Sequence, residues 1–138
     1  VLTRFEKEST LRKVEALIFA IGFNNSPHSA NPKGTKLSVF ESQYNDLVKK
    51  AQNLTSQIML VGLTNVDETH VQETYKNEKI EKYDAIIKKI ASQQALPFVD
   101  VFSTLSIDEF ADGFHPNAKG HQKIFEKVKE VGLTTFLH

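Results

Sequence analysis

The chain has 138 residues, of which 40% are hydrophobic and 25% charged, the size and composition of one ordinary globular domain. Its 17 Lys and Arg residues balance 17 Asp and Glu residues, which argues against a nucleic-acid-binding or membrane-binding surface. The absence of cysteine excludes disulfides, a thiolate nucleophile and cysteine-based metal sites, and is consistent with a reducing compartment such as the cytoplasm. The longest apolar run, Ala16–Phe23, is too short to span a bilayer.

In chain order, the sequence first predicts a short helix over about Leu2–Lys13 and a strand over Val14–Ile21. Two further apolar runs without polar alternation, Gln57–Leu63 and Pro97–Phe102, predict strands that are buried on both faces, as in a parallel sheet. Apolar residues that recur every three or four positions predict three long helices between and after these strands. These positions are Val39, Phe40, Tyr44, Leu47, Val48, Ala51 and Leu54, then Ile80, Tyr83, Ile86, Ile87, Ile90 and Ala91, and finally Ile124, Phe125, Val128 and Val131.

This alternation of strands and helices predicts a single α/β domain over residues 1–138, with a parallel sheet and right-handed crossovers. Three strands are few for such a sheet. Since the chain also begins at Val1, without an initiator methionine, we expect that strands are missing at the amino terminus. Open parallel sheets bind ligands beyond the carboxyl ends of their strands, where segments 22–36, 64–74 and 103–117 lie.

The last of these segments contains the strongest candidates for catalysis. Asp112 precedes His115 by three residues in a turn with Gly113 and Pro116, and Asn117 is a good N-cap for the helix that follows. A neutral histidine can accept a proton from a hydroxyl, and a carboxylate bonded to its other ring nitrogen fixes its tautomer. The same spacing also fits a structural role, in which Asp112 caps a turn and His115 packs under the last helix.

Two other segments, around Asp67 and around Asn24, could also have either a functional or a structural role. Asp67 and His70 form a second Asp-x-x-His pair, and we predict that they belong to a solvated polar loop. After the first predicted strand, Gly22 permits a positive φ, and the side-chain amide of Asn24 can donate a hydrogen bond to a developing oxyanion. Taken alone, this second segment also fits an ordinary turn, where glycine and asparagine are common.

Together, the segments around Asn24 and His115 resemble two blocks of the SGNH hydrolases, also called GDSL-type lipases or esterases. Gly22-Phe23-Asn24-Asn25 is similar to the family's Gly-x-Asn-Asp block, and Asp112-Gly113-Phe114-His115-Pro116 to its Asp-x-x-His-Pro block. Segments 61–68 and 116–121 extend the likeness. The resemblance implies a flavodoxin-like three-layer α/β/α sandwich, here incomplete. It also implies hydrolysis of small-molecule, lipid or sugar esters through an acyl-enzyme formed on a serine, without a cofactor.

On this resemblance, His115 is the general base, Asp112 its orienting carboxylate, and Asn24 with Gly22 the oxyanion hole. Asn25 stands where the family usually has aspartate. The family's Gly-Asp-Ser nucleophile turn is absent from the sequence. The serine nearest to the predicted site, Ser26, lacks the strand–turn–helix setting of a nucleophile. We therefore expect a truncated ester hydrolase domain that is inactive by itself.

Two alternatives remain open, together with one expectation about assembly. The chain could be a non-catalytic α/β module that binds a ligand or oligomerises. It could also hold a metal through Asp112, His115 and His121, although such a site would need a further ligand. A missing neighbouring strand would leave the outer edge of Val14–Ile21 unpaired, so we expect a homo-oligomer that forms through this edge.

Overall fold

A computed structural model describes residues 4–5, 7–8, 14–71 and 75–136. Three parallel strands form one sheet in the order β1-β2-β3: β1 (Ala16–Phe19), β2 (Gln57–Val61) and β3 (Phe98–Val99). All three fall within the predicted apolar runs and are shorter than predicted. The predicted α/β fold with a parallel sheet is therefore confirmed.

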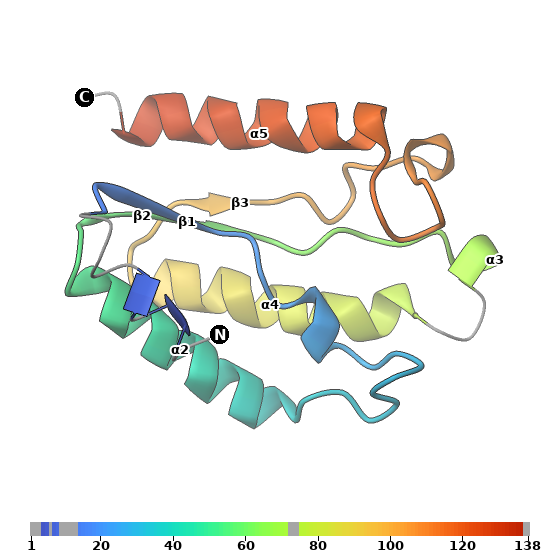
Figure 1. The fold of residues 1–138 in the computed structure, drawn as a ribbon, viewed down its shortest axis with the longest axis horizontal. Helices are drawn as coiled ribbons and strands as arrows, with labels where there is room; N and C mark the ends of the chain where they lie inside the picture. Colours follow the sequence, from blue (N-terminus) through green and yellow to red (C-terminus); the bar gives the residue numbers. More distant parts are fainter. Residues whose placement is uncertain (1–3, 6, 9–13, 72–74, 137–138) are drawn as a thin grey trace.

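The helices lie in layers on the two faces of the sheet (Figure 1). Helices α2 (Leu37–Gln52) and α4 (Asn77–Gln93) cover one face, and α5 (Ala118–Phe136) covers the other. Three short helices lie in the connections: η1 (Phe23–Asn25), α3 (Glu68–Val71) and η2 (Ile107–Glu109).

The main core lies between the sheet and the pair α2 and α4. The helical spacing read from the sequence gave most of the buried side of both helices, because residues three or four apart share one face. It was wrong for Val39 and Leu54, which are 42% and 40% exposed, and Leu54 lies beyond the end of α2. From α2 the core buries Phe40, Tyr44, Leu47, Val48 and Ala51, and from α4 Ile80, Tyr83, Ile87, Ile90 and Ala91. A smaller cluster on the opposite face joins Met59, Val61, Val99 and Val101 to Ile124, Val128, Val131 and Phe136 of α5.

The helix expected over Leu2–Lys13 lies largely outside the described residues. Those that are described, Arg4, Phe5, Lys7 and Glu8, have helical geometry. The ring of Phe5 lies 5.6 Å from the ring of Phe19 at the end of β1. This part of the chain therefore packs against the same face of the sheet as α2.

Candidate active site

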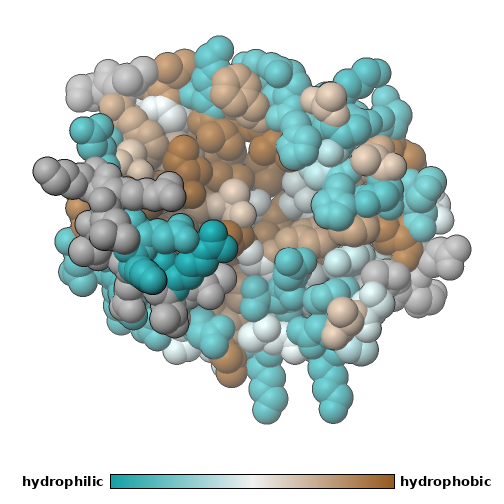
Figure 2. All heavy atoms as spheres, in the orientation of Figure 1, coloured by the Kyte–Doolittle hydropathy of each residue, from teal (hydrophilic) through white to brown (hydrophobic). Residues whose placement is uncertain are grey.

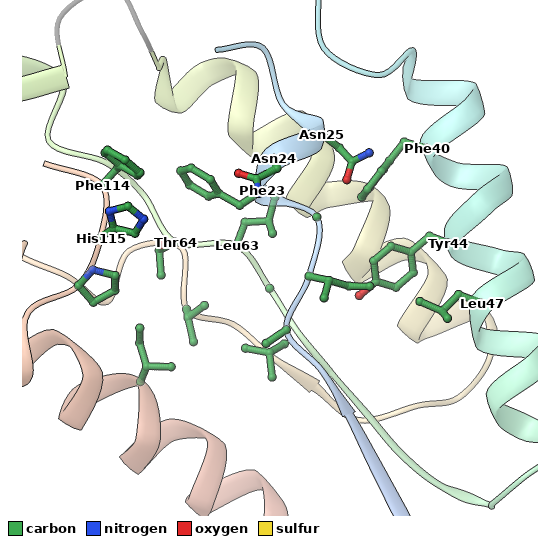
Figure 3. Close-up of a pocket in the computed structure, with 18 of the residues that line it drawn as sticks. Phe23, Asn24, Asn25, Phe40, Tyr44, Leu47, Leu63, Thr64, Phe114 and His115 are labelled. Atoms are coloured by element: carbon green, nitrogen blue, oxygen red, sulfur yellow. The ribbon is translucent and has the colours of Figure 1, made fainter. Parts of the chain in front are cut away.

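An open cavity of about 850 Å³ lies at the carboxyl ends of the strands. Its walls come from segments 20–25 after β1, 61–64 at the end of β2 and 114–116 before α5, together with side chains of α2 and α5. Figure 3 shows Asn24 and His115 on separate segments that both border this cavity. The fold thus brings both predicted segments to one site, although about ninety residues separate them.

Asp112 and His115 are directly paired at the rim of the cavity. The distance from His115 Nδ1 to Asp112 Oδ2 is 2.7 Å, and the backbone N–H groups of His115 and Phe114 donate to Asp112 Oδ1 at 2.8 and 3.2 Å. These bonds, above all that from the His115 side chain, lower the pKa of Asp112 to about 2. An ionised carboxylate can only accept, so Nδ1 is the donor and Nε2 of a neutral ring carries the lone pair.

The structural role considered for His115 does not fit its position. Its side chain is 65% exposed, so it does not pack beneath α5. The turn itself is held by Ala111, whose N–H donates to the carbonyl of His115 at 2.8 Å. Asn117 caps α5 as predicted, because its Oδ1 accepts from the N–H groups of Lys119 and Gly120. The imidazole is therefore mounted on a fixed turn and faces solvent.

The prediction of a solvated loop for the second Asp-x-x-His pair is wrong for Asp67. Asp67 is 5% exposed, and its Oδ1 accepts from the N–H and the hydroxyl of Thr69, at 3.0 and 2.6 Å. His70 is exposed and its Nδ1 lies 3.8 Å from Asp67 Oδ2. The N–H of Asp67 donates to the carbonyl of Gly113 at 2.7 Å. The second pair thus supports the turn that carries the first.

Gly22 and Asn24 belong to a tight turn at the end of β1. Gly22 has a φ of +127°, which confirms the positive φ expected at this glycine. A Cβ there would stand 3.1 Å from the ring of Phe40. Its carbonyl accepts from the N–H of Asn25 at 2.9 Å, which closes η1. The side chain of Asn25 donates to Thr35 Oγ1 at 2.9 Å. Asn24 is exposed and lines the cavity, where its amide can reach a ligand.

Ser26 does not have the setting of a nucleophile. It is fully buried, and its hydroxyl donates to the carbonyl of Phe23 at 2.7 Å. Its own carbonyl is bonded to the ring of His28. The described residues that line the cavity include no serine. Ser26 therefore shapes the turn after β1 rather than the chemistry at His115.

Tyr44 is a cavity residue that the sequence did not single out, because its position in the helical pattern marks it only as core. It is 3% exposed, and its phenol oxygen has no hydrogen-bond partner among the described residues. Burial, and secondarily the carboxylate of Asp84, raise the pKa of Tyr44, so the phenol stays neutral. Asp84 is itself buried and accepts the N–H of Leu63 at 2.6 Å. No sequence pattern predicts that Tyr44 and Asp84 are buried near each other, since the packing of α2 on α4 brings them together.

The described residues contain no group of three or more His, Asp or Glu side chains able to hold a metal ion. The metal hypothesis for Asp112, His115 and His121 thus has no support in this part of the chain. None of the described helices is both long and apolar enough to cross a membrane.

The fold and the site are those of an α/β domain with a paired aspartate and histidine at the rim of a cavity. The family model described as GDSL-like lipase/acylhydrolase matches residues 1–123. This chain belongs to that family. No curated protein sequence gives a significant match.

Several solved structures share the fold. An acetylxylan esterase from Geobacillus stearothermophilus is 21% identical, with a TM-score of 0.78 over 95% of this chain and 65% of that one. A lipase/acylhydrolase from Enterococcus faecalis is 18% identical, with a TM-score of 0.76 over 94% and 68%. This chain thus spans less than two thirds of the length of the Geobacillus esterase. Two further structures are of catalytic mutants of that esterase, changed at its serine 15 and its aspartate 191.

Proposed function

We propose that this chain carries the acid–base part of a serine ester hydrolase, with His115 as general base, Asp112 as its orienting carboxylate and Asn24 with Gly22 as the oxyanion hole. The observation that carries the proposal is the 2.7 Å contact between His115 and Asp112 at the rim of a cavity that Asn24 and Gly22 also line. Membership of the GDSL-like lipase/acylhydrolase family supports the same chemistry.

In this mechanism Nε2 of His115 takes the hydroxyl proton of a serine as the serine oxygen attacks the ester carbonyl. The amide of Asn24 donates to the oxyanion that forms, and Asp112 stabilises the imidazolium. The imidazolium then protonates the leaving alcohol, and an acyl-enzyme remains. Water, deprotonated by His115, then attacks the acyl carbonyl. The bond to the serine oxygen breaks, the acid is released, and the imidazolium returns its proton to the serine.

We propose that the serine comes from outside these 138 residues. In the Geobacillus esterase the serine and aspartate changed in the catalytic mutants are 176 positions apart, which exceeds the whole length of this chain. Two observations support the same proposal: no serine is found among the described residues that line the cavity, and the hydroxyl of Ser26 is buried and bonded. By itself the chain should then be inactive as an esterase.

The cavity favours an uncharged ester. Its walls are mainly aliphatic and aromatic, and among the described residues that line it only His115 and Tyr44 have titratable side chains. A charged substrate group would be desolvated there, and the nearest carboxylate, Asp112, is already bonded to His115. We therefore propose a neutral small-molecule, lipid or sugar ester as the substrate, in keeping with the acetylxylan esterase among the structural relatives.

The test is hydrolysis of p-nitrophenyl acetate by the purified chain from pH 5 to 9, beside the variant His115→Ala. We expect equal, background rates for the two proteins. A rate that rises with the deprotonation of a histidine and is lost in His115→Ala would contradict the proposed external serine, because a nucleophile would then lie in this chain or its oligomer. Addition of a serine-bearing segment, taken from the Geobacillus esterase around its serine 15, should create activity that depends on His115.

We also propose that the isolated chain associates with itself through the edge of β1. Ile18 in β1 is 51% exposed, and among the described residues β1 pairs only with β2. An open apolar edge is a template for another strand. Light scattering should show a dimer that Ile18→Lys dissociates, whereas Ile107→Lys, at a 67% exposed position on η2, should leave it intact. A monomer at high concentration would contradict this assembly.

A further inference from the structure

Four aromatic rings pack together beside the imidazole of His115. The ring centroid of Phe114 lies 3.9 Å from that of His115 (Figure 3). Phe114 also packs on Tyr75 at 5.2 Å and stacks on Phe23 at 6.4 Å. Tyr75 in turn contacts the ring of Phe23 at 5.1 Å and the ring of His28 at 5.6 Å. We call these four residues, Phe23, His28, Tyr75 and Phe114, the aromatic cluster.

Tyr75 is the central member of the aromatic cluster. Its ring contacts each of the three other rings, and it is 6% exposed, whereas the others are half-buried. Burial, and secondarily the carboxylate of Asp112, raise the pKa of its phenol, which therefore stays neutral. Tyr75 thus joins the turn after β1, which carries Asn24, to the turn before α5, which carries His115.

The connection between β2 and α4 fixes the position of Tyr75. Two residues further on, the side chain of Asn77 bonds to both backbone groups of Val66. Its Nδ2 donates to the carbonyl at 2.9 Å, and its Oδ1 accepts from the N–H at 2.8 Å. The N–H of Asn77 donates to Glu68 Oε1 at 2.6 Å. Because these bonds tie the start of α4 to the segment after β2, they hold the backbone that presents Tyr75.

The imidazole of His115 needs such a support, because burial does not hold it in place. Its side chain is 65% exposed and that of Asp112 is 48% exposed, so water competes for the bond between them. The cavity that His115 borders is open, and Figure 2 shows hydrophobic side chains around a depression between the two helical layers. A fixed ring on one side, that of Phe114, limits rotation of the imidazole and leaves it accessible to a substrate.

We infer that Tyr75 is a positioning residue, which acts through Phe114 to hold the imidazole of His115 against its carboxylate partner. Because the ring of Tyr75 also packs on Phe23, it sets the place of the imidazole relative to the neighbouring Asn24. This role rests on the proposed function only in that His115 is the base. The pairing that Tyr75 supports can be measured in the chain alone, without any esterase activity.

The first test is the titration of Asp112 in the chain alone, followed by its carboxyl carbon chemical shift. Tyr75→Leu and Phe114→Leu should each raise the midpoint by about half a pH unit or more, because the bond from the imidazole of His115 weakens. Tyr75→Phe keeps the ring and should titrate like the original chain. Tyr83→Leu removes an equally buried tyrosine ring from α4 and is the control for lost stability, with no change expected in the midpoint.

Activity in the complex with the serine-bearing segment of the Geobacillus esterase gives the second readout. Tyr75→Leu should lower kcat for p-nitrophenyl acetate by about tenfold or more and leave KM within about twofold, because a misplaced base slows the chemical step. Tyr75→Phe should retain the original kcat.

The outcomes separate the positioning role from the proposed function. A midpoint that stays unchanged in Tyr75→Leu and Phe114→Leu, or that moves equally in Tyr83→Leu, would overturn the positioning role. If Tyr75→Leu does not fold, the titration of Phe114→Leu decides. A shifted midpoint without activity in any complex would instead contradict the proposed function and leave the positioning role established.

Discussion

Asp112 and His115 meet at 2.7 Å, whereas Asp67 and His70, with the same spacing in the same chain, stand 3.8 Å apart. In both pairs two donors engage Oδ1 of the aspartate, but the donors differ. Thr69 offers Asp67 both an N–H and a hydroxyl, at 3.0 and 2.6 Å, which engage one carboxylate oxygen and cap α3. Asp112 Oδ1 accepts instead from two backbone N–H groups, those of Phe114 at 3.2 Å and of His115 itself at 2.8 Å. The backbone N–H of His115 thus ties the histidine itself to Asp112, whose second oxygen lies within hydrogen-bond distance of the imidazole.

The two pairs also differ in burial, and a backbone hydrogen bond joins their two segments. Asp67 is buried and donates its backbone N–H to Gly113, in the turn between Asp112 and His115. Asp112 and His115 are 48% and 65% exposed in their side chains. One Asp-x-x-His segment therefore acts as support and the other as a candidate for proton transfer. Spacing alone does not separate these roles, but the surroundings of each carboxylate do.

The largest expected effect comes from replacing the two histidines in the complex with the serine-bearing segment. His115→Ala should lower kcat/KM for p-nitrophenyl acetate by about a hundredfold or more, because a general base is lost. His70→Ala should change it less than about twofold, since this imidazole is exposed and stands 3.8 Å from its aspartate. Equal losses in the two variants would contradict the distinction between the pairs.

A smaller effect is expected from Asp112→Asn. An amide can donate to His115 Nδ1 and stabilise the tautomer whose Nε2 carries the proton, which cannot act as a base. The expected loss in kcat/KM is about tenfold to a hundredfold, below that for a buried aspartate, because water can replace part of the interaction at this half-exposed site. Asp67→Asn is the control, and its effect should appear in stability rather than in the pH profile of activity.

Gly113→Ala tests the contact between the pairs through stability. Gly113 has φ +89°, and a Cβ there would stand 2.7 Å from the Cβ of His70. Strain and overlap together should lower the free energy of unfolding by about 1–3 kcal/mol in urea titrations. Gly132→Ala in α5 is the matched control, because its Cβ would meet only Met59 at 3.6 Å and alanine favours a helix. Comparable losses in both variants would show that the contact with His70 is unimportant.

Periodicity in the sequence predicted the layers and strands well, since apolar runs and three- to four-residue repeats follow directly from burial. A different signal, the sequence motif itself, led to Asp112 and His115. A glycine and a proline around them and an N-cap after them indicate a rigid turn. The sequence did not predict that Asp67 is buried, because that depends on Thr69 and on a carbonyl of Gly113 almost fifty residues away. Nor could the sequence separate Tyr44 from the other core residues of α2, since the lack of a described hydrogen-bond partner for its hydroxyl is a property of the packed structure.

The smallest predicted effect is a shift in the titration of Asp112. Its folded-state pKa of about 2 lies below the ordinary value of about 3.9, so its ionisation favours folding. That contribution is complete above about pH 4 and is lost as the pH falls toward 2. Because the side-chain bond from His115 is the largest cause, His115→Ala should move the titration up toward 3.9, although the two backbone N–H groups hold it below that value. Carboxyl carbon chemical shifts measured from pH 1.5 to 6 would show the shift. An unchanged titration in His115→Ala, with His70→Ala as the control, would mean that the backbone of the turn alone sets the charge of Asp112 and that the imidazole is not held by it.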